Sequence, residues 1–412
     1  MIKLYRFCFF SLVGILILIY SYKLIYLTPD FANEIIEPVP LKGVNLHYDG
    51  DYKDIVRISE IGLDVVRTDI LWSRVESQKG QYDFKTPKYD ELHNYLLENN
   101  IRPIYILAYG NRLYEDSMAV NTDKARTAFI NYVDEVSKRY SGENVIWEIW
   151  NEPNGVYWEP EGNNIEEYSL LVEEASKVIN NNDPTGTIIA PALDKVDVKS
   201  LDWLKSLMDK GVINNIDAIS IHPYSAKIPE QLEEGLIKIS EMLEYYTTKD
   251  IPIISSEVGY STGRNWYGLN LTDREQASYL LRMYFFHTYK GIPVSVWYNW
   301  KDKGNDKESG EQNFGIVKQN GTRKDAYHAI ATMNNFLDDF YYVGKEELKR
   351  EDSYFLKFKN QKKEEILVFW TTGDEYELNY ARGGQQYSML GGEVDNSSGL
   401  IVTNEPNYLL ID

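Results

Sequence analysis

The sequence of 412 residues has a single cysteine, Cys8, and only five histidines. One cysteine cannot form an intramolecular disulfide or a cysteine-based metal site, and no His-Glu-x-x-His pattern occurs. We therefore expect neither a catalytic metal nor another cofactor. Basic residues are also scarce, since 43 Lys and Arg stand against 63 Asp and Glu, a formal net charge of −20. Because phosphate binding requires a basic surface, this deficit argues against nucleic acid as a partner.

Charge is also missing from a run near the amino terminus. Residues 7–22 carry none and are rich in Phe, Leu, Ile and Val, and Lys23 can snorkel to extend the apolar span to about Leu27. Lys3 and Arg6 precede the span, which predicts a cytoplasmic amino terminus and an exported remainder.

No small-residue cleavage site follows this run. Residues 1–27 are therefore predicted to be an uncleaved membrane anchor formed by one transmembrane helix, with the rest of the chain outside the cytoplasm. Secretion after signal cleavage is the alternative. Residues 28–40, which contain three prolines, are expected to be a linker.

From residue 41 to 337, short apolar strands alternate with amphipathic helices. The first strand is expected at residues 42–48 and the eighth at 294–300. Thr86, Thr122 and Thr272 are expected to cap helices, the first with Pro87 behind it and the last in a capping box with Glu275. Eight alternating strand–helix units predict an α/β fold, a (β/α)8 TIM barrel.

The sequence pattern changes after Leu337, and no segment beyond it shows the hydrophobic periodicity of an amphipathic helix. Residues 354–358, 365–371, 387–390 and 408–411 are predicted to be strands between polar or Gly-rich turns. Residues 338–412 are therefore expected to form a small C-terminal antiparallel β-sandwich domain.

Two barrel strands end in a glutamate. The segment 145–154 starts as an apolar and aromatic strand and breaks at Asn151-Glu152-Pro153, because proline cannot donate to a sheet. The segment 251–260 delivers Glu257 in the same way. Barrel enzymes place their chemistry at the carboxyl ends of strands, so the two glutamates predict a carboxylate pair acting on a glycosidic bond.

These motifs resemble those of the large clan of retaining (β/α)8 glycoside hydrolases in which Asn-Glu-Pro ends strand four. The resemblance implies that Glu152 is the acid/base and Glu257 the nucleophile. It further implies substrate-site roles for five residues that match the motifs of the clan: Arg67, Asn151, His222, Tyr224 and Trp297. Arg67 and Tyr224 would adjoin the nucleophile, Asn151 would contact the sugar 2-hydroxyl, and Trp297 would floor the reacting subsite.

Several of these residues also have structural interpretations. Arg67 could neutralise the buried Glu148, His222 could be a hydrogen-bonded core histidine, and Trp297 could fill the barrel interior. Three further residues near predicted strand ends, His47, Trp158 and Trp300, are candidates for sugar-binding positions, because aromatic faces pack against the apolar faces of sugars.

At the family level, the sequence motif around Glu152, the predicted C-terminal domain and the predicted membrane anchor look most like glycoside hydrolase family 39. They resemble in particular its membrane-anchored exopolysaccharide hydrolases. Family 5 cellulase-like enzymes are the near alternative. The resemblance implies a retaining hydrolase that cuts an extracellular or capsular polysaccharide, with endo action favoured. The alternatives are a non-hydrolytic glycan-binding partner of polysaccharide export and a transglycosylase.

Overall fold

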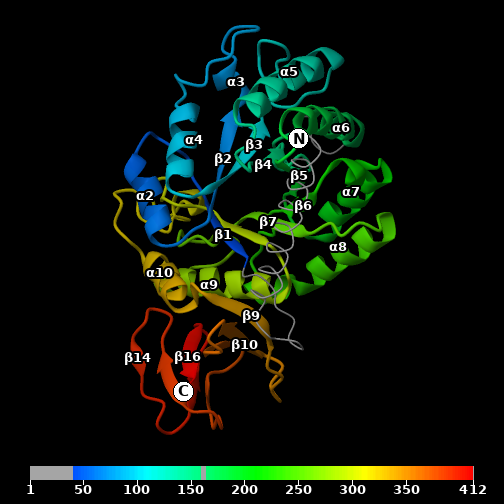
Figure 1. The fold of residues 1–412 in the computed structure, drawn as a ribbon. Helices are drawn as coiled ribbons and strands as arrows, with labels where there is room; N and C mark the ends of the chain where they lie inside the picture. Colours follow the sequence, from blue (N-terminus) through cyan, green and yellow to red (C-terminus); the bar gives the residue numbers. More distant parts are fainter. Residues whose placement is uncertain (1–39, 159–163, 412) are drawn as a thin grey trace, which may run out of the picture.

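The computed structural model describes residues 40–158 and 164–411. Within them, eight parallel strands close into a barrel in sequence order, with the eighth hydrogen-bonded back to the first (Figure 1). The predicted (β/α)8 barrel is confirmed. Its strands are β1 (Leu41–Asn45), β2 (Val65–Leu71), β3 (Arg102–Ala108), β4 (Ile146–Ile149), β5 (Thr187–Leu193), β6 (Ala218–Ile221), β7 (Ile253–Val258) and β8 (Val294–Trp297).

Helices follow the strands and surround the barrel (Figure 1). The α-helices are α2 (Tyr52–Glu60), α3 (Trp72–Val75), α4 (Tyr89–Glu98), α5 (Asp123–Arg139), α6 (Ile165–Asn182), α7 (Val198–Asp209), α8 (Glu233–Tyr246), α9 (Asp273–Tyr289) and α10 (Asp325–Leu337). Three short 3₁₀ helices are η1 (Val212–Asn215), η2 (Pro229–Leu232) and η3 (Gly310–Gln312).

Two of the three predicted helix caps are confirmed. The Thr122 side chain accepts from the Ala125 amide, and Thr272 forms its capping box with Glu275. The prediction for Thr86 was wrong, because α4 begins at Tyr89. Asp83 accepts hydrogen bonds from the amides of residues 85 and 86, which holds this stretch in a turn before the helix starts.

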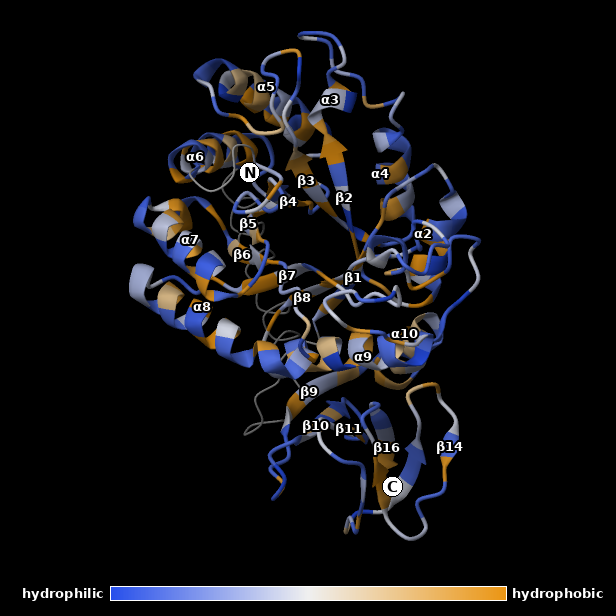
Figure 2. Ribbon diagram, turned by 180° about the vertical axis from the view of Figure 1, so that it is seen from behind, coloured by the Kyte–Doolittle hydropathy of each residue, from blue (hydrophilic) through white to orange (hydrophobic). Residues whose placement is uncertain are grey.

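Apolar side chains fill the barrel interior near the starts of the strands. This inner cluster consists of Val65, Ile104, Ile146, Ile189, Ala218, Ile254, Val294 and Val296. A larger cluster lies between the strands and the helices. In Figure 2 the barrel strands are mostly hydrophobic, and the helices that surround them carry hydrophilic stretches. Because the inner cluster fills the amino-terminal half of the barrel, polar residues near the strand ends face the carboxyl-terminal mouth.

The C-terminal strands form an antiparallel sheet in the order β14-β13-β16-β11-β10-β9, and β12 pairs with β15 in a second, two-stranded sheet. An antiparallel β domain is therefore confirmed. The strands are β9 (Phe340–Lys345), β10 (Ser353–Asn360), β11 (Glu365–Thr371), β12 (Tyr376–Leu378), β13 (Gly384–Tyr387), β14 (Glu393–Val394), β15 (Leu400–Val402) and β16 (Asn407–Ile411). The strand expected at 387–390 lies earlier, at β13, and β9, β12, β14 and β15 were not predicted.

One side of the larger sheet packs against the barrel. Phe285 of α9 contacts the rings of Trp370 and Tyr408, and Phe336 of α10 lies 4.9 Å from Tyr408 between ring centroids. A separate cluster that includes Phe355, Phe369 and Val402 joins this sheet to β12 and β15. The β domain is thus attached to α9 and α10, as Figure 1 shows.

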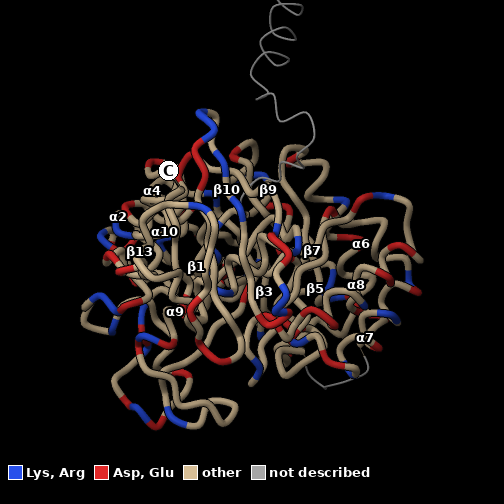
Figure 3. The backbone as a smooth tube through the Cα atoms, turned by 90° about the horizontal axis from the view of Figure 1, so that it is seen from below, with Lys and Arg blue, Asp and Glu red and all other residues tan. Residues whose placement is uncertain are grey.

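The predicted membrane anchor, residues 1–27, and most of the predicted linker, residues 28–40, lie outside the described residues. Among the helices of residues 40–158 and 164–411, none is both long and apolar enough to cross a bilayer. Acidic and basic residues are interspersed over the helices and loops of this part of the chain (Figure 3).

Candidate active site

Both strand-end glutamates reach the mouth of the barrel. Glu257 is the next-to-last residue of β7, and Glu152 follows the end of β4 by three residues. The backbone after β4 turns sharply, since Trp150 and Glu152 have φ angles of 73° and 46°, in the left-handed region that non-glycine residues seldom adopt. Such conformations are concentrated at functional sites, where the surrounding structure holds them.

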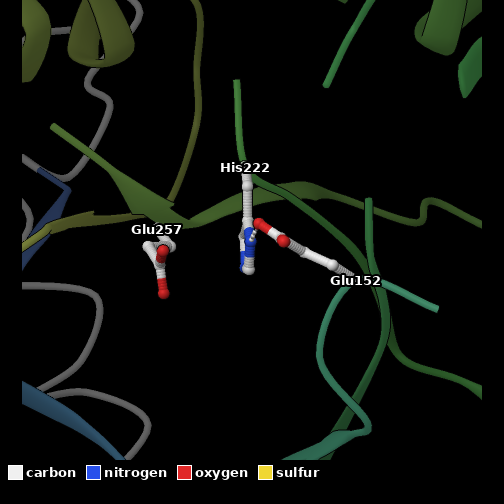
Figure 4. A group of neighbouring side chains, drawn as sticks. All are labelled: Glu152, His222 and Glu257. Carbon is white, nitrogen blue, oxygen red and sulfur yellow. Dashed lines mark hydrogen bonds and ion pairs between the residues drawn. The ribbon is translucent and has the colours of Figure 1, made fainter. Parts of the chain in front are cut away.

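Glu152, His222 and Glu257 form one group, in which the potential ligand atoms all lie within 4.8 Å of one another (Figure 4). A carboxylate oxygen of Glu152 is therefore within 4.8 Å of one of Glu257. Retaining glycosidases hold their two carboxyl groups about 5–5.5 Å apart, whereas inverting enzymes need about 6.5–9.5 Å to admit a water. The observed spacing suits direct attack by one carboxylate.

Arg67 of β2 connects four side chains of the site. Its Nε donates to Glu148 Oε2 at 2.6 Å, its Nη1 contacts Glu257, and its Nη2 donates to Asn151 Oδ1 at 2.8 Å and lies 3.1 Å from His222 Nε2. Arg67 is almost fully buried. One guanidinium thus pairs with the buried Glu148 and also contacts Glu257.

The contacts of His222 determine its tautomer. Arg67 Nη2 can only donate, so His222 Nε2 accepts and carries no proton. The ring proton then resides on Nδ1, which donates to Glu152 Oε1 at 2.8 Å. Because Oε1 of Glu152 is occupied by this bond, the acidic proton of a protonated Glu152 belongs on Oε2.

Glu257 is surrounded by donors. Tyr224 donates its hydroxyl to Glu257 Oε1 at 2.8 Å, and Asn45 donates its amide to Oε2 at 2.7 Å. Burial alone would raise the pKa of Glu257, but the charge of Arg67 and the hydrogen bonds from Tyr224 and Asn45 help to hold that pKa below its ordinary value. Glu257 is therefore the ionised member of the pair.

Glu152 shows the opposite shift. Burial raises the pKa of Glu152, and the negative charge of Glu257 acts in the same direction, against the hydrogen bond from His222. Two carboxyl groups whose environments push their pKa values apart are suited to different roles, one as acid and one as nucleophile.

Two adjoining cavities meet at the carboxylates. The smaller, called the inner cavity, has about 110 Å³ and is lined by residues that include His47, Asp69, Tyr109, Asn151 and Lys303. The larger, called the outer cavity, has about 580 Å³ and is lined chiefly by residues of the loops after β4, β5, β6, β7 and β8. Glu152, Glu257, Tyr157, Tyr298 and Lys303 line both cavities. His47, a predicted sugar-binding candidate, thus lies on the wall of the inner cavity.

Three predicted sugar-binding tryptophans are not on these walls. Trp158, Trp297 and Trp300 are all fully buried. The Trp158 indole donates to Asn121 Oδ1 at 3.0 Å, the Trp297 indole donates to the Phe314 carbonyl at 3.1 Å, and Trp300 packs beside Tyr327. Their assignment to the substrate cleft is corrected, because all three side chains anchor loops or pack in the outer core.

Strand parity explains the error at Trp297. Val294 and Val296 belong to the inner cluster of the barrel, and side chains along a strand alternate between faces, so Trp297 points outward toward the helices. Tyr298, the next residue, lines both cavities and is 8% exposed. Tyr298 and Asn45 are site residues that sequence reasoning missed, although the same parity count would have indicated Tyr298.

The side chains of Glu152, His222 and Glu257 are not well suited to bind a metal ion. Glu152, His222 and Glu257 offer ligand-type atoms, but both ring nitrogens of His222 already take part in hydrogen bonds. The Arg67 guanidinium also contacts Glu257 and would repel a cation placed there.

Comparison with known proteins adds an independent view of this site. The sequence profile of the cellulase family (glycosyl hydrolase family 5) matches residues 32–303. Endoglucanase E-5 of Thermobifida fusca is 25% identical over 228 residues, which are 52% of this chain and 44% of that protein. The chain thus spans less than half the length of this relative.

Solved structures share the fold. A family 39 glycoside hydrolase from Bacteroides cellulosilyticus superposes with a TM-score of 0.77 at 23% identity, covering 91% of this chain and 81% of the other. A family 30 endoxylanase from Clostridium papyrosolvens gives a TM-score of 0.61 at 12% identity, covering 92% and 98%. The resemblance to the glycoside hydrolase clan is confirmed. The profile match is to family 5, the near alternative, whereas the likeness to family 39 shows the fold.

Proposed function

Since the chain belongs to the cellulase family of glycosyl hydrolases, family 5, we propose that it hydrolyses glycosidic bonds with retention of anomeric configuration. The observation that carries the proposal is the pair Glu152 and Glu257, whose oxygens approach within 4.8 Å and whose pKa values are shifted in opposite directions. This combination suits a double displacement with one acid/base and one nucleophile.

In the first step, a Glu257 oxygen attacks the anomeric carbon while Glu152 gives its Oε2 proton to the leaving glycosidic oxygen. The bond between the anomeric carbon and that oxygen breaks, and a glycosyl ester of Glu257 forms. Arg67, Tyr224 and Asn45 orient the attacking carboxylate through their hydrogen bonds. Asn151, whose Oδ1 is held by Arg67, lies at the same cavity and presents its amide to the sugar.

In the second step, Glu152 becomes the base. Esterification removes the negative charge of Glu257, which had raised the pKa of Glu152. Glu152, which gave its proton to the leaving oxygen in the first step, therefore stays ionised until it takes a proton from water as the water oxygen attacks the anomeric carbon. Breaking of the ester bond restores the Glu257 carboxylate, and the product keeps its original configuration.

We propose a polysaccharide as the substrate, cleaved internally. The outer cavity of about 580 Å³ begins at Glu152 and offers room for a continuing chain beyond the scissile bond. Endoglucanase E-5 and the family 30 endoxylanase, by their names, act within polymers. A net charge of −20 fits a neutral better than a strongly anionic polymer.

We further propose that residues 1–27 anchor the enzyme in a membrane, with the barrel on the extracytoplasmic side. The uncharged run at residues 7–22, preceded by Lys3 and Arg6, supports this arrangement. Membrane fractionation of cells making the full chain and a variant lacking residues 1–27 tests it. Recovery of both proteins in the soluble fraction would contradict the anchor.

The activity is tested by incubating the full-length chain, Glu152→Gln and Glu257→Gln with bacterial exopolysaccharides, β-glucans and 4-nitrophenyl β-glycosides. The wild type should release oligosaccharides or nitrophenol, and each variant should lose at least about 100-fold in rate. Equal rates for wild type and both variants would overturn the assignment. Glycan binding by all three proteins without hydrolysis would favour the non-hydrolytic alternative.

A further inference from the structure

The outer cavity continues into a second hollow. A groove of about 520 Å³, called the side groove, lies beside it and is lined by residues from the loops after β5, β6 and β7 and from α7 and α8. The two hollows share Lys195, Tyr224 and Tyr267 in their walls. The outer cavity, which Glu152 lines, and the side groove are thus two successive hollows.

Tyr267 lies at the junction of these hollows and is 46% exposed. It occupies a tight turn in which the Leu269 amide donates to the Trp266 carbonyl at 2.8 Å and the Gly268 amide to the Asn265 carbonyl at 3.2 Å. Trp266 fixes the base of the turn, since its ring packs edge-on against Phe314 with 4.8 Å between centroids. The turn thus presents an aromatic side chain to the cleft on a firm support.

The backbone of this turn carries a conformational cost. Tyr267 has a φ angle of 48°, and Asn265, two residues before it in the same turn, has one of 56°. A bulky residue is disfavoured in the left-handed region, and such strain is retained chiefly at functional sites. Glycine or asparagine at position 267 would turn the chain at less cost, so the tyrosine side chain itself needs an explanation.

Two other exposed apolar side chains line the hollows that Tyr267 also lines. Val156, 60% exposed, lines the outer cavity, and Val198, 69% exposed, lines the side groove. Apolar groups gathered on a polar surface commonly mark a binding region. Lys195 and Lys199 add hydrogen-bond donors to the same walls. The surface thus combines an aromatic face with polar groups, as sugar rings with apolar faces and hydroxyl rims require.

We propose that Tyr267 is a sugar-stacking platform on the leaving-group side, and that the enzyme binds at least two sugar units of a polysaccharide beyond the scissile bond. The inference rests on the proposed glycosidase function and specifies its substrate as a chain rather than a small glycoside. The first unit occupies the outer cavity, and the next reaches the side groove across the ring of Tyr267.

The test compares Tyr267→Ala and Tyr267→Phe with wild type on two substrates. These are the polysaccharide and the 4-nitrophenyl β-glycoside that the wild type cleaves fastest in the panel above. Tyr267→Ala should raise KM for the polysaccharide about 3- to 10-fold with little change in kcat, whereas Tyr267→Phe keeps the ring and the wild-type KM. The effect of Tyr267→Ala on kcat/KM for the nitrophenyl glycoside should be smaller than for the polysaccharide, because the nitrophenyl group fills only the outer cavity and does not reach the side groove.

A matched control is Tyr245→Ala, because Tyr245 is 81% exposed on α8 and lines neither hollow. This control should behave as wild type on both substrates. An unchanged polysaccharide KM in Tyr267→Ala would overturn the platform while leaving the hydrolase intact. Absence of wild-type activity on every substrate would instead overturn the proposed function, and the platform with it.

Discussion

At the scale of single residues, the site is organised by one hydrogen-bonded path from Glu152 through His222 and Arg67 to Glu257. Every donor on this path is fixed, because the arginine cannot accept and the histidine has one ring proton left to give. The path links the acid to the nucleophile. It holds both side chains in place while their protonation states differ.

Replacing His222 by Phe tests this path. The hydrogen bond from His222 lowers the pKa of Glu152, so its loss raises that pKa and moves the basic limb of the kcat/KM profile to higher pH. The rate should fall about 10- to 100-fold, because the acid is no longer oriented. A pH–rate profile of both proteins checks the shift. A lower rate with an unmoved basic limb would mean that His222 acts only in packing.

Asp69 gives a prediction about stability. Burial raises the pKa of Asp69 to about 6, with the charges of Glu257 and Glu148 adding to the shift and those of Arg67 and Lys303 opposing it. Since the folded pKa exceeds the unfolded one, the folded state holds a proton that the unfolded state releases. The contribution of this group to stability is therefore lost as pH rises from about 4 through 6.

Asp69→Asn removes this titration. Its stabilising effect relative to wild type should be about 1 kcal/mol larger at pH 8 than at pH 5, as measured by urea unfolding at both values. Asp202→Asn, at an exposed position, supplies a control for the exchange of Asp for Asn. A gain in unfolding free energy by Asp69→Asn over wild type that does not grow with pH would refute the raised pKa of Asp69.

At the scale of elements, a buried ion pair fastens the β domain to the barrel. Arg282 of α9 donates two hydrogen bonds to Glu230 of η2, at 2.8 and 2.6 Å, and the Trp370 indole of β11 donates to the same carboxylate at 2.7 Å. Both charged residues are at most 5% exposed. Three elements thus converge on one carboxylate.

Removing one partner of this pair leaves a buried charge uncompensated. Glu230→Ala should cost about 3–5 kcal/mol of unfolding free energy, and Arg282→Met should cost a similar amount. The double variant should be less destabilised than the sum of the two, since no lone charge remains. Urea unfolding of wild type, the two single variants and the double variant completes this double-mutant cycle. Losses of unfolding free energy that simply add would show that Glu230 and Arg282 are not coupled.

Sequence patterns predicted those elements whose signals are local. The Asn-Glu-Pro corner and the second strand-end glutamate predicted a carboxylate pair, and the structure brings Glu152 and Glu257 within 4.8 Å of each other. The helix caps at Thr122 and Thr272 were predicted from their side chains. The wrong predictions concern features that depend on a shift of one residue along a strand or on a competing hydrogen bond. Trp297, the last residue of β8, points away from the site, whereas Tyr298, the next residue, lines it. The Thr86 amide donates to Asp83, so this stretch forms a turn and α4 starts later. Short strands such as β12 carry too few residues to show a period.

At the scale of the whole molecule, α9 and α10 of the barrel share an apolar interface with β10, β11, β13 and β16 of the β domain. Separating the two parts would expose Phe285, Phe336 and Trp370 to water, at a cost of roughly 1.5–3 kcal/mol for each large side chain. We therefore expect calorimetry to record one cooperative unfolding transition for both parts. Two resolved transitions would show that the β domain unfolds independently.

The central claim is that Glu152 and Glu257 perform a double displacement. The most direct test is NMR of the first product formed from the 4-nitrophenyl β-glycoside that the enzyme cleaves fastest, recorded before mutarotation. The account predicts the β-anomer first, because the carboxylate oxygens approach within 4.8 Å, closer than the spacing that inverting enzymes use to admit a water. Appearance of the α-anomer first would mean inversion, and would contradict the assignment of Glu257 as nucleophile.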